Sequence, residues 1–505
     1  MQNNSRTFKS IRNVIFGIGS KVIMLLLTFV SRAVFIKVLG EELLGINSLY
    51  TNILYVLSLA ELGFGSAMSY SFYKPLADKD IDKLAALIGF YRRVYTIIAM
   101  AVAVIGVSLL PFLDVIINLD KPIEHLELYY LLFLANAVAS YLFVYKTAIM
   151  NADQNNYIIN LYSLLTTFLK VVFQIIVLVF LRSFVAYLVI MIISTVLNNV
   201  LVSIMTDKMY PYIKNKVNLD IKEKLAIYDN VKSIFVYNVS STLLDCIDTI
   251  LISVVISTIA VGYYANYTTV INNVLAFVTI LFTAITASVG NLSVNETPEK
   301  KYKTYCIMNM IGYGLAAICV TCFYTLIDDL ICLWIGKEFV LSEGVLLAFM
   351  GTVYIFCTFK PTLAYREAVG LFSKIKYVVL IAAIINASLS FVLGKIIGLS
   401  GIIIATIVAR GSTMCWYEPI VLHKDYFFCS SKKYFISQII NMLCVALCMF
   451  LASTLIKLCN FDNNWFTLVI KGVISLAVVG VVYFIRYFKT EEFRYAIKKV
   501  KGALK

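Results

Sequence analysis

Charged residues are scarce in this 505-residue chain: they make up 14% of the sequence, whereas hydrophobic residues make up 61%. One globular core cannot bury that much apolar surface, so the composition excludes a soluble domain. The mean hydropathy of +0.87 instead indicates that lipid is the solvent for most of the chain.

The sequence also lacks the usual motifs of catalysis and metal binding. Its two histidines are His125 and His423, and all 11 cysteines lie at or after Cys246 without the paired spacing of a metal site. A Walker-type phosphate loop, a serine nucleophile elbow and a zinc-binding helix motif are missing as well. We therefore expect no metal, no bound cofactor, no ATP hydrolysis and no enzymatic activity.

Long apolar runs recur along the whole chain. A hydrocarbon core about 30 Å thick is crossed by roughly 20 helical residues, and about fourteen runs reach that length. They cover approximately residues 11–38, 44–72, 88–112, 125–150, 158–181, 184–205, 230–256, 262–290, 303–327, 343–365, 374–394, 400–422, 434–457 and 464–486. Their continuous pattern differs from the short alternating strands of a membrane barrel, so we predict an all-α polytopic membrane protein.

The first run is expected to stay in the protein as a span. It is long, it carries Lys21, Arg32 and Lys37, and it has no small-residue cleavage site. These features differ from those of a cleavable signal peptide.

The distribution of basic residues predicts the orientation in the membrane. With the N-terminus in the cytoplasm, most Lys and Arg fall on that side, notably in residues 73–93, 206–232 and 291–303 and in the tail from Arg486. This positive-inside asymmetry predicts an even number of spans and two cytoplasmic termini. It also explains the net charge of +14 through orientation and anionic lipid headgroups, so we expect no nucleic-acid partner.

Two pairs of similar stretches predict an internal repeat. Gly-Ile-Asn-Ser-Leu-Tyr-Thr-Asn at 45–52 aligns with Gly-Tyr-Tyr-Ala-Asn-Tyr-Thr-Thr at 262–269, and Tyr145-Lys146 aligns with Phe359-Lys360. We predict a six-helix half at 1–205, a cytoplasmic linker at 206–229, a second six-helix half at 230–422, two additional helices at 423–486 and a basic cytoplasmic tail at 487–505. Parallel repeats of this kind are typical of transporters with a central cavity and alternating access.

Basic residues inside the spans are the main candidates for substrate binding. A charge at mid-span costs about 2.5–3.5 kcal/mol, so it needs an aqueous cavity, a partner or an escape to the interface. Arg32 lies in the outer part of the first span, Lys170 and Arg410 lie near mid-depth, and Lys360 lies near the inner end of its span. An excess of interior cations suits an anionic substrate, and arginine can bind phosphate through two parallel hydrogen bonds. Ion pairing is the alternative for Arg32, Lys170 and Arg410, and extension to the interface is the alternative for Lys360.

Three acids are also expected within the membrane: Glu61, Asp245 and Asp248. Asp245 and Asp248 are three residues apart and therefore share one face of a helix. They are candidates for binding a coupling proton or sodium ion, and pairing with a basic residue is the alternative. Coupling to H⁺ or Na⁺ is the one ionic requirement that the sequence suggests.

The first hundred residues carry a family resemblance. The carrying segments are Ser-Arg-Ala-Val-Phe-Ile-Lys-Val-Leu-Gly at 31–40, Leu-Gly-Ile-Asn-Ser-Leu-Tyr-Thr-Asn-Ile-Leu at 44–54, Leu-Ser-Leu-Ala-Glu-Leu-Gly-Phe-Gly at 57–65 and Tyr-Lys-Pro-Leu-Ala at 73–77. They resemble the N-terminal signature of the polysaccharide transporters, the Wzx-type O-antigen flippases of the multidrug/oligosaccharidyl-lipid/polysaccharide (MOP) exporter superfamily. The predicted fourteen spans in two halves extend the resemblance over the chain.

The resemblance implies a specific transport activity. Such a flippase takes an undecaprenyl-diphosphate-linked oligosaccharide, a repeat unit of O-antigen, capsule or exopolysaccharide, from the inner to the outer leaflet of the bacterial cytoplasmic membrane. Arg32 and Glu61 lie in the matched segments and are implied as cavity residues. Lys170, Lys360, Arg410, Asp245 and Asp248 rest on depth alone. The expected partners are this substrate and the phospholipid membrane, with the chain a monomer that associates with polysaccharide polymerase machinery.

Three other functions stay open at the level of sequence. A lipid II flippase differs little from the first interpretation. A cation-coupled multidrug exporter of the same superfamily would be expected to have twelve spans and an acidic interior. A membrane-embedded glycosyltransferase or ligase would need a sizeable outer loop, whereas the outer loops here, such as 111–125 and 327–343, are short.

Overall fold

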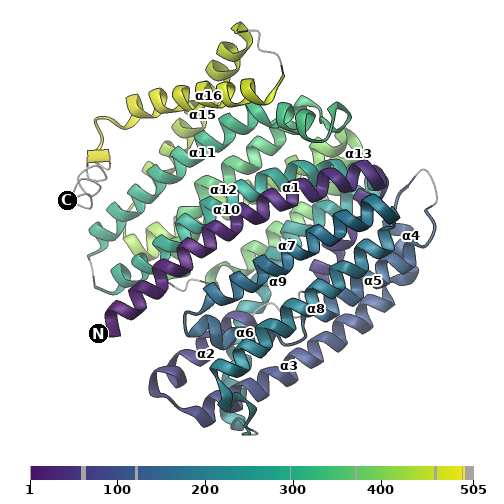
Figure 1. Cartoon of the computed structure of the whole chain (residues 1–505). Helices are drawn as coiled ribbons and strands as arrows, with labels where there is room; N and C mark the ends of the chain where they lie inside the picture. Colours follow the sequence, from purple (N-terminus) through teal and green to yellow (C-terminus); the bar gives the residue numbers. More distant parts are fainter. Residues whose placement is uncertain are drawn as a thin grey trace. The chain divides into compact units, whose positions relative to one another are not determined.

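The computed structural model describes residues 2–58, 64–119, 123–215, 217–295, 297–369, 372–459, 463–491 and 493–494. Within these residues the regular secondary structure is entirely helical, as the sequence predicts (Figure 1). The chain divides into two compact units, residues 1–262 and 263–505, which are described separately here. The predicted boundaries of the two halves, the linker, the added helices and the tail stay predictions.

The helices follow one another with short connections. The first unit contains α1 (Gln2–Leu57), α2 (Phe64–Asp78), α3 (Ile81–Ser108), η2 (Leu110–Phe112), α4 (Leu113–Ile116), α5 (Leu126–Ser140), α6 (Val144–Ala152), α7 (Asn156–Leu181), α8 (Phe184–Met209), η3 (Pro211–Lys214) and α9 (Ile221–Val255). Helix α10 (Thr258–Asn295) begins in the first unit and continues into the second. The second unit then contains α11 (Pro298–Trp334), η4 (Lys337–Phe339), α12 (Glu343–Val369), α13 (Phe372–Ser412), α14 (Met414–Leu422), the π-helical turn η5 (His423–Phe427), α15 (Lys432–Leu458) and α16 (Trp465–Tyr487).

The helices establish a multi-pass membrane protein. In the described part of the chain, eleven helices are long and apolar enough to cross a membrane, or twelve if α5 and α6, which meet at 42°, form one span. Two of the eleven are interrupted. Val22–Leu57 contains Gly40 at φ 85°, and Ile375–Phe427 contains Gly398 at φ 65°. Glycine tolerates positive φ without a Cβ clash, so the backbone can change direction there. Both breaks fall between predicted spans, and the predicted number of fourteen stays a prediction.

In the first unit, α7 and α8 form a hairpin that packs beside α1 and α5 (Figure 1). Arg182 ends α7 in a left-handed conformation, and the Ser183 side chain accepts a hydrogen bond from Ala186 N at 3.3 Å, which caps α8. Farther along, Thr195 Oγ1 donates to Asn136 Oδ1 of α5 at 2.8 Å. Polar contacts between helices are a main source of association in lipid, because apolar side chains gain little there from leaving the solvent.

In the second unit, α11 packs against α12, α15 and α16. Polar side chains again link the helices. Lys471 Nζ of α16 lies 2.6 Å from Asp329 Oδ2 of α11, and the hydroxyls of Ser475 and Thr325 are 2.9 Å apart. Lys471 therefore pairs with α11 rather than extending alone to the interface.

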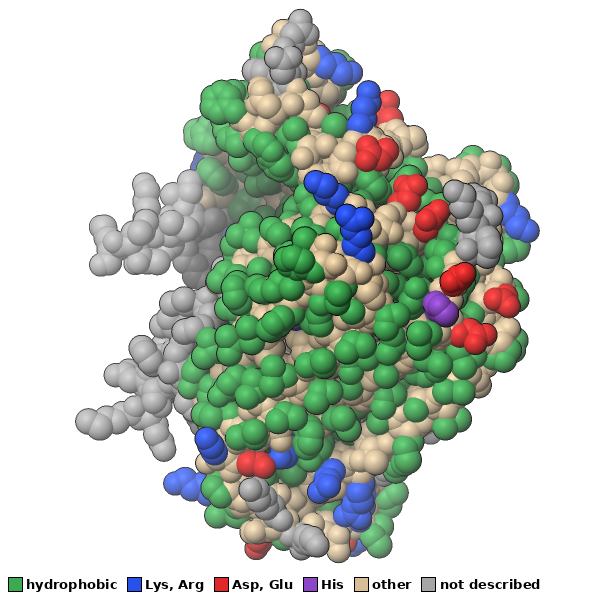
Figure 2. Space-filling view, turned by 45° about the vertical axis from the view of Figure 1, so that its right-hand side comes forward, with side chains coloured by type: hydrophobic (Ala, Val, Ile, Leu, Met, Phe, Trp, Pro, Cys, Tyr) green, Lys and Arg blue, Asp and Glu red, His purple; other side chains and the backbone are tan. Residues whose placement is uncertain are grey.

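The outer surface is apolar, as lipid requires. Hydrophobic side chains fill the middle of the face drawn in Figure 2, and the charged side chains gather toward its upper and lower parts. On α15 and α16 the exposed fractions of large side chains are high, for example 62% for Leu443, 66% for Phe450 and 64% for Val469. These helices thus present apolar surface that water would not stabilise but hydrocarbon does.

Gly45 allows α1 to pack directly against the start of α10. A Cβ atom added at Gly45 would overlap the carbonyl oxygen of Thr258. Thr258 is itself held, because its backbone N–H donates to Asn118 O at 2.8 Å and its hydroxyl accepts from Asn118 N at 2.9 Å. We expect Gly45→Ala to lower the free energy of unfolding by about 1–3 kcal/mol through overpacking.

Chemical unfolding in detergent would measure this effect, with Gly314→Ala as the matched control. Gly314 also lies inside a helix, and a Cβ added there meets open space. The control is expected to gain up to about 1 kcal/mol from the higher helix propensity of alanine. Equal stabilities of the two variants would contradict the packing argument.

Candidate functional site

Arg32, the first predicted cation, lies in α1 beside the start of α8. Tyr187 of α8 lies close to both Ser31 and the Arg32 guanidinium. One turn farther along α1, Phe35 makes edge-to-face contacts with Phe184 and Tyr187, with ring centroids 5.7 and 5.1 Å apart. Aromatic packing against α8 therefore positions this part of α1.

Lys170 lies on the side of α7 that packs against α8. The residues one turn away in each direction, Thr166 and Gln174, are buried. Thr166 Oγ1 donates to an asparagine side chain of α8 at 3.3 Å, and Gln174 Nε2 donates to the backbone oxygen of Tyr187 at 3.2 Å. Residues four apart share a helix face, so Lys170 lies between these polar contacts. Tyr187, which sequence reasoning missed, thus connects the surroundings of Arg32 and Lys170.

Lys170 differs from Lys146 and Lys471 in its electrostatic environment. Lys146 Nζ lies 2.6 Å from Asp207 Oδ1 and 2.7 Å from Ser203 Oγ, and Lys471 is paired with an aspartate. Lys170 is partly buried, and its ammonium has no ion pair or hydrogen bond to any residue that the structure describes. An uncompensated ammonium within an apolar span is costly, which makes Lys170 the strongest candidate for an anionic ligand.

The predicted acids have different environments. Asp245 and Asp248 both lie in α9 and both are near Cys246. Asp245 is exposed, whereas Asp248 is 5% exposed. Only Asp248 therefore lies in the protein interior. Glu61 lies outside the described residues, and the roles of all three acids stay predictions.

Lys360 and Arg410 are partly buried residues of the second unit. The Lys360 ammonium lies 4.6 Å from the ring centroid of Phe356, a distance typical of a cation–π contact. Arg410, in α13, lies near Cys415 of α14. They occupy two different helices, α12 and α13. Their part in substrate binding stays a prediction.

A fully buried ion pair in the second unit was missed by the sequence analysis. Arg366 and Glu418 are both 0% exposed, and Arg366 Nη1 lies 3.1 Å from each carboxylate oxygen of Glu418. Arg366 Nη2 also lies 3.6 Å from Glu367 Oε1. The sequence signal that could have indicated this pair was Glu418, an acid inside the predicted span 400–422. This ion pair joins α12 to α14, and each of the two charges has a partner of opposite sign.

A second polar cluster lies where α6 and α8 end. Tyr210 Oη donates to Asp153 Oδ2 at 2.8 Å, and Asn155 Nδ2 donates to the same carboxylate oxygen at 2.8 Å. Burial, and then the hydrogen bond to Asp153, raises the pKa of Tyr210. The tyrosine stays a neutral donor at physiological pH, and the cluster is suited to holding the α6–α7 turn.

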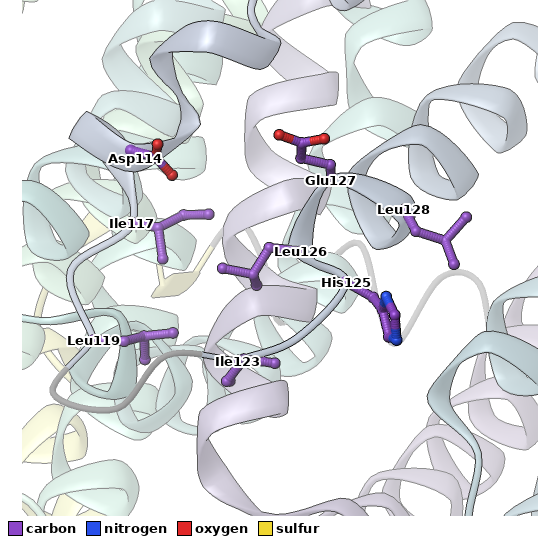
Figure 3. Close-up of a pocket in the computed structure, with 8 residues that line it drawn as sticks. All are labelled: Asp114, Ile117, Leu119, Ile123, His125, Leu126, Glu127 and Leu128. Carbon is purple, nitrogen blue, oxygen red and sulfur yellow. The ribbon is translucent and has the colours of Figure 1, made fainter.

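A cavity of about 660 Å³ lies between α4 and the start of α5. Figure 3 shows Asp114 on α4 and Glu127 on α5 among the residues that line it. The hydroxyl of Tyr50 donates to Leu126 O at 3.1 Å and supports this wall. Two carboxylates facing one cavity repel a diphosphate, so this cavity does not suit the predicted substrate.

Comparison with known proteins finds no matching family model and no matching curated protein. Solved structures do match. "Lipid II flippase MurJ, inward closed conformation" is similar over 94% of this chain and 99% of that chain, at 16% identity and a TM-score of 0.68. An inward-facing multidrug resistance MATE family transporter of the MOP superfamily is similar over 78% of this chain and 93% of that chain, at 16% identity and a TM-score of 0.56. A mutant of the Vibrio cholerae MATE transporter VcmN is similar over 84% of this chain and 100% of that chain, at 17% identity and a TM-score of 0.53.

These similarities are at the level of the fold. The matched structures are those of a flippase and of transporters, and the matches extend over most of the chain. The specific Wzx-type family, the substrate and the site residues stay predictions. The helices identify a multi-pass membrane protein, and its fold is similar to those of the MurJ flippase and the MATE transporters.

Proposed function

We propose that this chain is a flippase for undecaprenyl-diphosphate-linked oligosaccharides, which are the repeat units of O-antigen, capsule or exopolysaccharide. It works by alternating access and without enzymatic turnover. One observation carries the proposal: Lys170 is a basic residue within an apolar span that has no anionic partner in the described part of the chain. A diphosphate supplies the charge that such an ammonium needs. The likeness to the lipid II flippase structure supports a lipid-linked substrate.

The proposal includes the setting of the protein. We place it in the bacterial cytoplasmic membrane with both termini in the cytoplasm, as a monomer beside polysaccharide polymerase machinery. In that orientation, two negative charges that move outward against an inside-negative potential gain about 4.6 kcal/mol per 100 mV. Antiport of H⁺ or Na⁺ at Asp248 would add to this driving force.

Two related functions are the alternatives. The MATE neighbours support a cation-coupled multidrug exporter, and the buried Asp248 is the residue that favours it. The similarity to the MurJ structure supports a lipid II flippase. The substrate that accumulates when the protein is lost distinguishes the three functions.

The test is a clean deletion strain that carries no second flippase gene, complemented with the wild-type chain. We expect the deletion to trap lipid-linked glycan on the cytoplasmic face and the wild type to restore export. The measurement is protection of the glycan from an enzyme added outside spheroplasts. Restored ethidium efflux without any change in glycan would support the exporter instead, and accumulation of lipid II would support the lipid II flippase.

A further inference from the structure

A second cavity lies wholly within the second unit, where α11 and α15 begin and α16 ends. Its volume is about 530 Å³, within the range of small-ligand pockets. None of its described lining residues is acidic, in contrast to the cavity beside Asp114. The wall is lined by Tyr302, Tyr305, Tyr313, Tyr434 and Tyr487, together with Lys433 and Arg486. The cavity is therefore cationic and aromatic.

Arg486 is held in place without losing its charge. Its Nη2 donates to Ser437 O at 3.2 Å, and its Nη1 donates to Asn441 Oδ1 at 3.4 Å. The guanidinium carbon lies 5.0 Å from the ring centroid of Tyr487 and 5.7 Å from that of Tyr313. All four partners are neutral, and no carboxylate in the described part of the chain pairs with Arg486. The nearby Glu491 is paired with Lys303 at 3.3 Å.

The same wall contains two acceptor atoms that lack donors. His423 Nδ1 lies 2.7 Å from Pro419 O and must donate to it, so Nε2 carries a lone pair. Asn309 Nδ2 donates to Tyr305 O at 3.0 Å, which fixes Oδ1 as the other acceptor. Within the described residues, neither His423 Nε2 nor Asn309 Oδ1 has a hydrogen-bond partner, although the two residues are 1% and 5% exposed. An unsatisfied buried polar group costs about 1–3 kcal/mol, so these atoms favour a ligand with hydroxyl donors.

An apolar strip continues from the cavity along α15. Ile436, Ile440, Leu443 and Leu447 recur at helical spacing, with exposed fractions of 46, 46, 62 and 48%. Tyrosines are typical of the level of the lipid headgroups, where one end of the side chain is apolar and the other is hydrated. A ligand with its polar part in the cavity can therefore lay acyl chains on this strip.

We propose that this cavity binds the headgroup of an anionic glycerophospholipid with free hydroxyls, of the phosphatidylglycerol type. The phosphate lies between Lys433 and Arg486, and the headgroup hydroxyls donate to His423 Nε2 and Asn309 Oδ1. Both acceptors are buried, so the hydroxyls reach them when tyrosine side chains of the wall rotate. The inference goes beyond the proposed function and does not depend on the transported substrate.

Native mass spectrometry of the purified full chain tests the proposal. The probes are phosphatidylglycerol, phosphatidic acid and phosphatidylcholine with identical acyl chains, and the measurement is the dissociation constant of the first lipid adduct. We expect phosphatidylglycerol to bind most tightly, phosphatidic acid next because it keeps the phosphate, and phosphatidylcholine least. Equal binding of phosphatidylglycerol and phosphatidic acid would overturn the role of the hydroxyls.

Variants locate the site. Lys433→Gln and Arg486→Gln are each expected to weaken the first adduct about fivefold, the value of one basic residue at an anionic membrane surface. Lys457→Gln is the matched control, because Lys457 is exposed and lies near the far end of the same helix, α15. Lys433 is exposed as well, so Lys433→Gln leaves the fold intact even if Arg486→Gln does not. An equal effect of Lys433→Gln and Lys457→Gln would overturn the location.

A competition experiment separates a resident phospholipid from a transported lipid. We expect undecaprenyl phosphate to displace bound phosphatidylglycerol less effectively than phosphatidylglycerol itself, because it has no headgroup hydroxyls. Displacement by undecaprenyl phosphate at lower concentration would assign the cavity to a polyprenyl lipid and overturn the proposal. Loss of glycan export in the deletion strain bears on the proposed function alone and leaves this result unaffected.

Discussion

Glu418→Ala is expected to lower the free energy of unfolding by about 3–5 kcal/mol, because it leaves the charge of Arg366 buried without its main partner. Both side chains are 0% exposed, and two hydrogen bonds of 3.1 Å join them. Glu367 remains as a weaker partner at 3.6 Å, which keeps the loss within this range. Denaturant unfolding of the purified chain in one detergent measures the change.

The double variant Arg366→Met with Glu418→Met is the informative control. Burying two apolar side chains removes both desolvation costs, so the double variant is expected within about 1 kcal/mol of the wild type. The exposed pair of Lys83 and Glu223, each 40% exposed, provides a second comparison. Glu223→Ala is expected to cost less than about 1 kcal/mol. A double variant as unstable as Glu418→Ala would show that shape, rather than charge, accounts for the effect.

Lys170→Met is expected to slow transport strongly while making the protein more stable. The substitution removes an ammonium that has no partner among the described residues, which stabilises an apolar span by about 1–3 kcal/mol. It also removes a charge-assisted bond to the substrate phosphate, worth about 1.5–3 kcal/mol, or roughly 10- to 100-fold in transport rate. Glycan export in the complemented deletion strain and unfolding in detergent measure the two effects.

Lys471→Met is the matched control for this prediction. It also replaces a lysine within a span, but it breaks the pair with Asp329 and is expected to destabilise the protein. A cation that serves only the fold thus changes stability in the opposite direction. If Lys170→Met were to lower stability and leave export normal, Lys170 would be a structural residue and the proposed substrate contact would be wrong. Arg32→Ala, expected to reduce export as well, extends the same test to α1.

Local hydrophobicity predicted the helical character of the chain and the places where its helices break. Gly40 and Gly398 lie between predicted spans, because a turn between two spans needs polar or small residues and glycine accepts positive φ. The number of spans was less accessible. Continuous helices cross some of the predicted boundaries, and α5 and α6 bend within a single predicted span.

Pairings between distant residues were not accessible from the sequence. Arg366 and Glu418 are 52 residues apart, and no helical periodicity relates two residues on different helices. The same holds for Tyr187, whose position between α1 and α7 depends on how the α7–α8 hairpin packs. The depth of a charge could be estimated from the apolar runs, which is why Lys170 was a candidate. That Lys170 has no partner in the described structure could be learned only from the three-dimensional arrangement of the helices.

The contact between Lys471 and Asp329 also has a consequence for biosynthesis. Asp329 leaves the ribosome 142 residues before Lys471, which at about 5–20 residues per second is an interval of roughly 7–28 s. During that time a carboxylate of α11 waits without its cation. Until its partner arrives, this carboxylate must stay in a polar environment, because a bare charge in hydrocarbon costs several kcal/mol. We therefore expect α11 to be released fully into lipid only when α16 arrives, so that a helix made late in synthesis completes the insertion of a much earlier one.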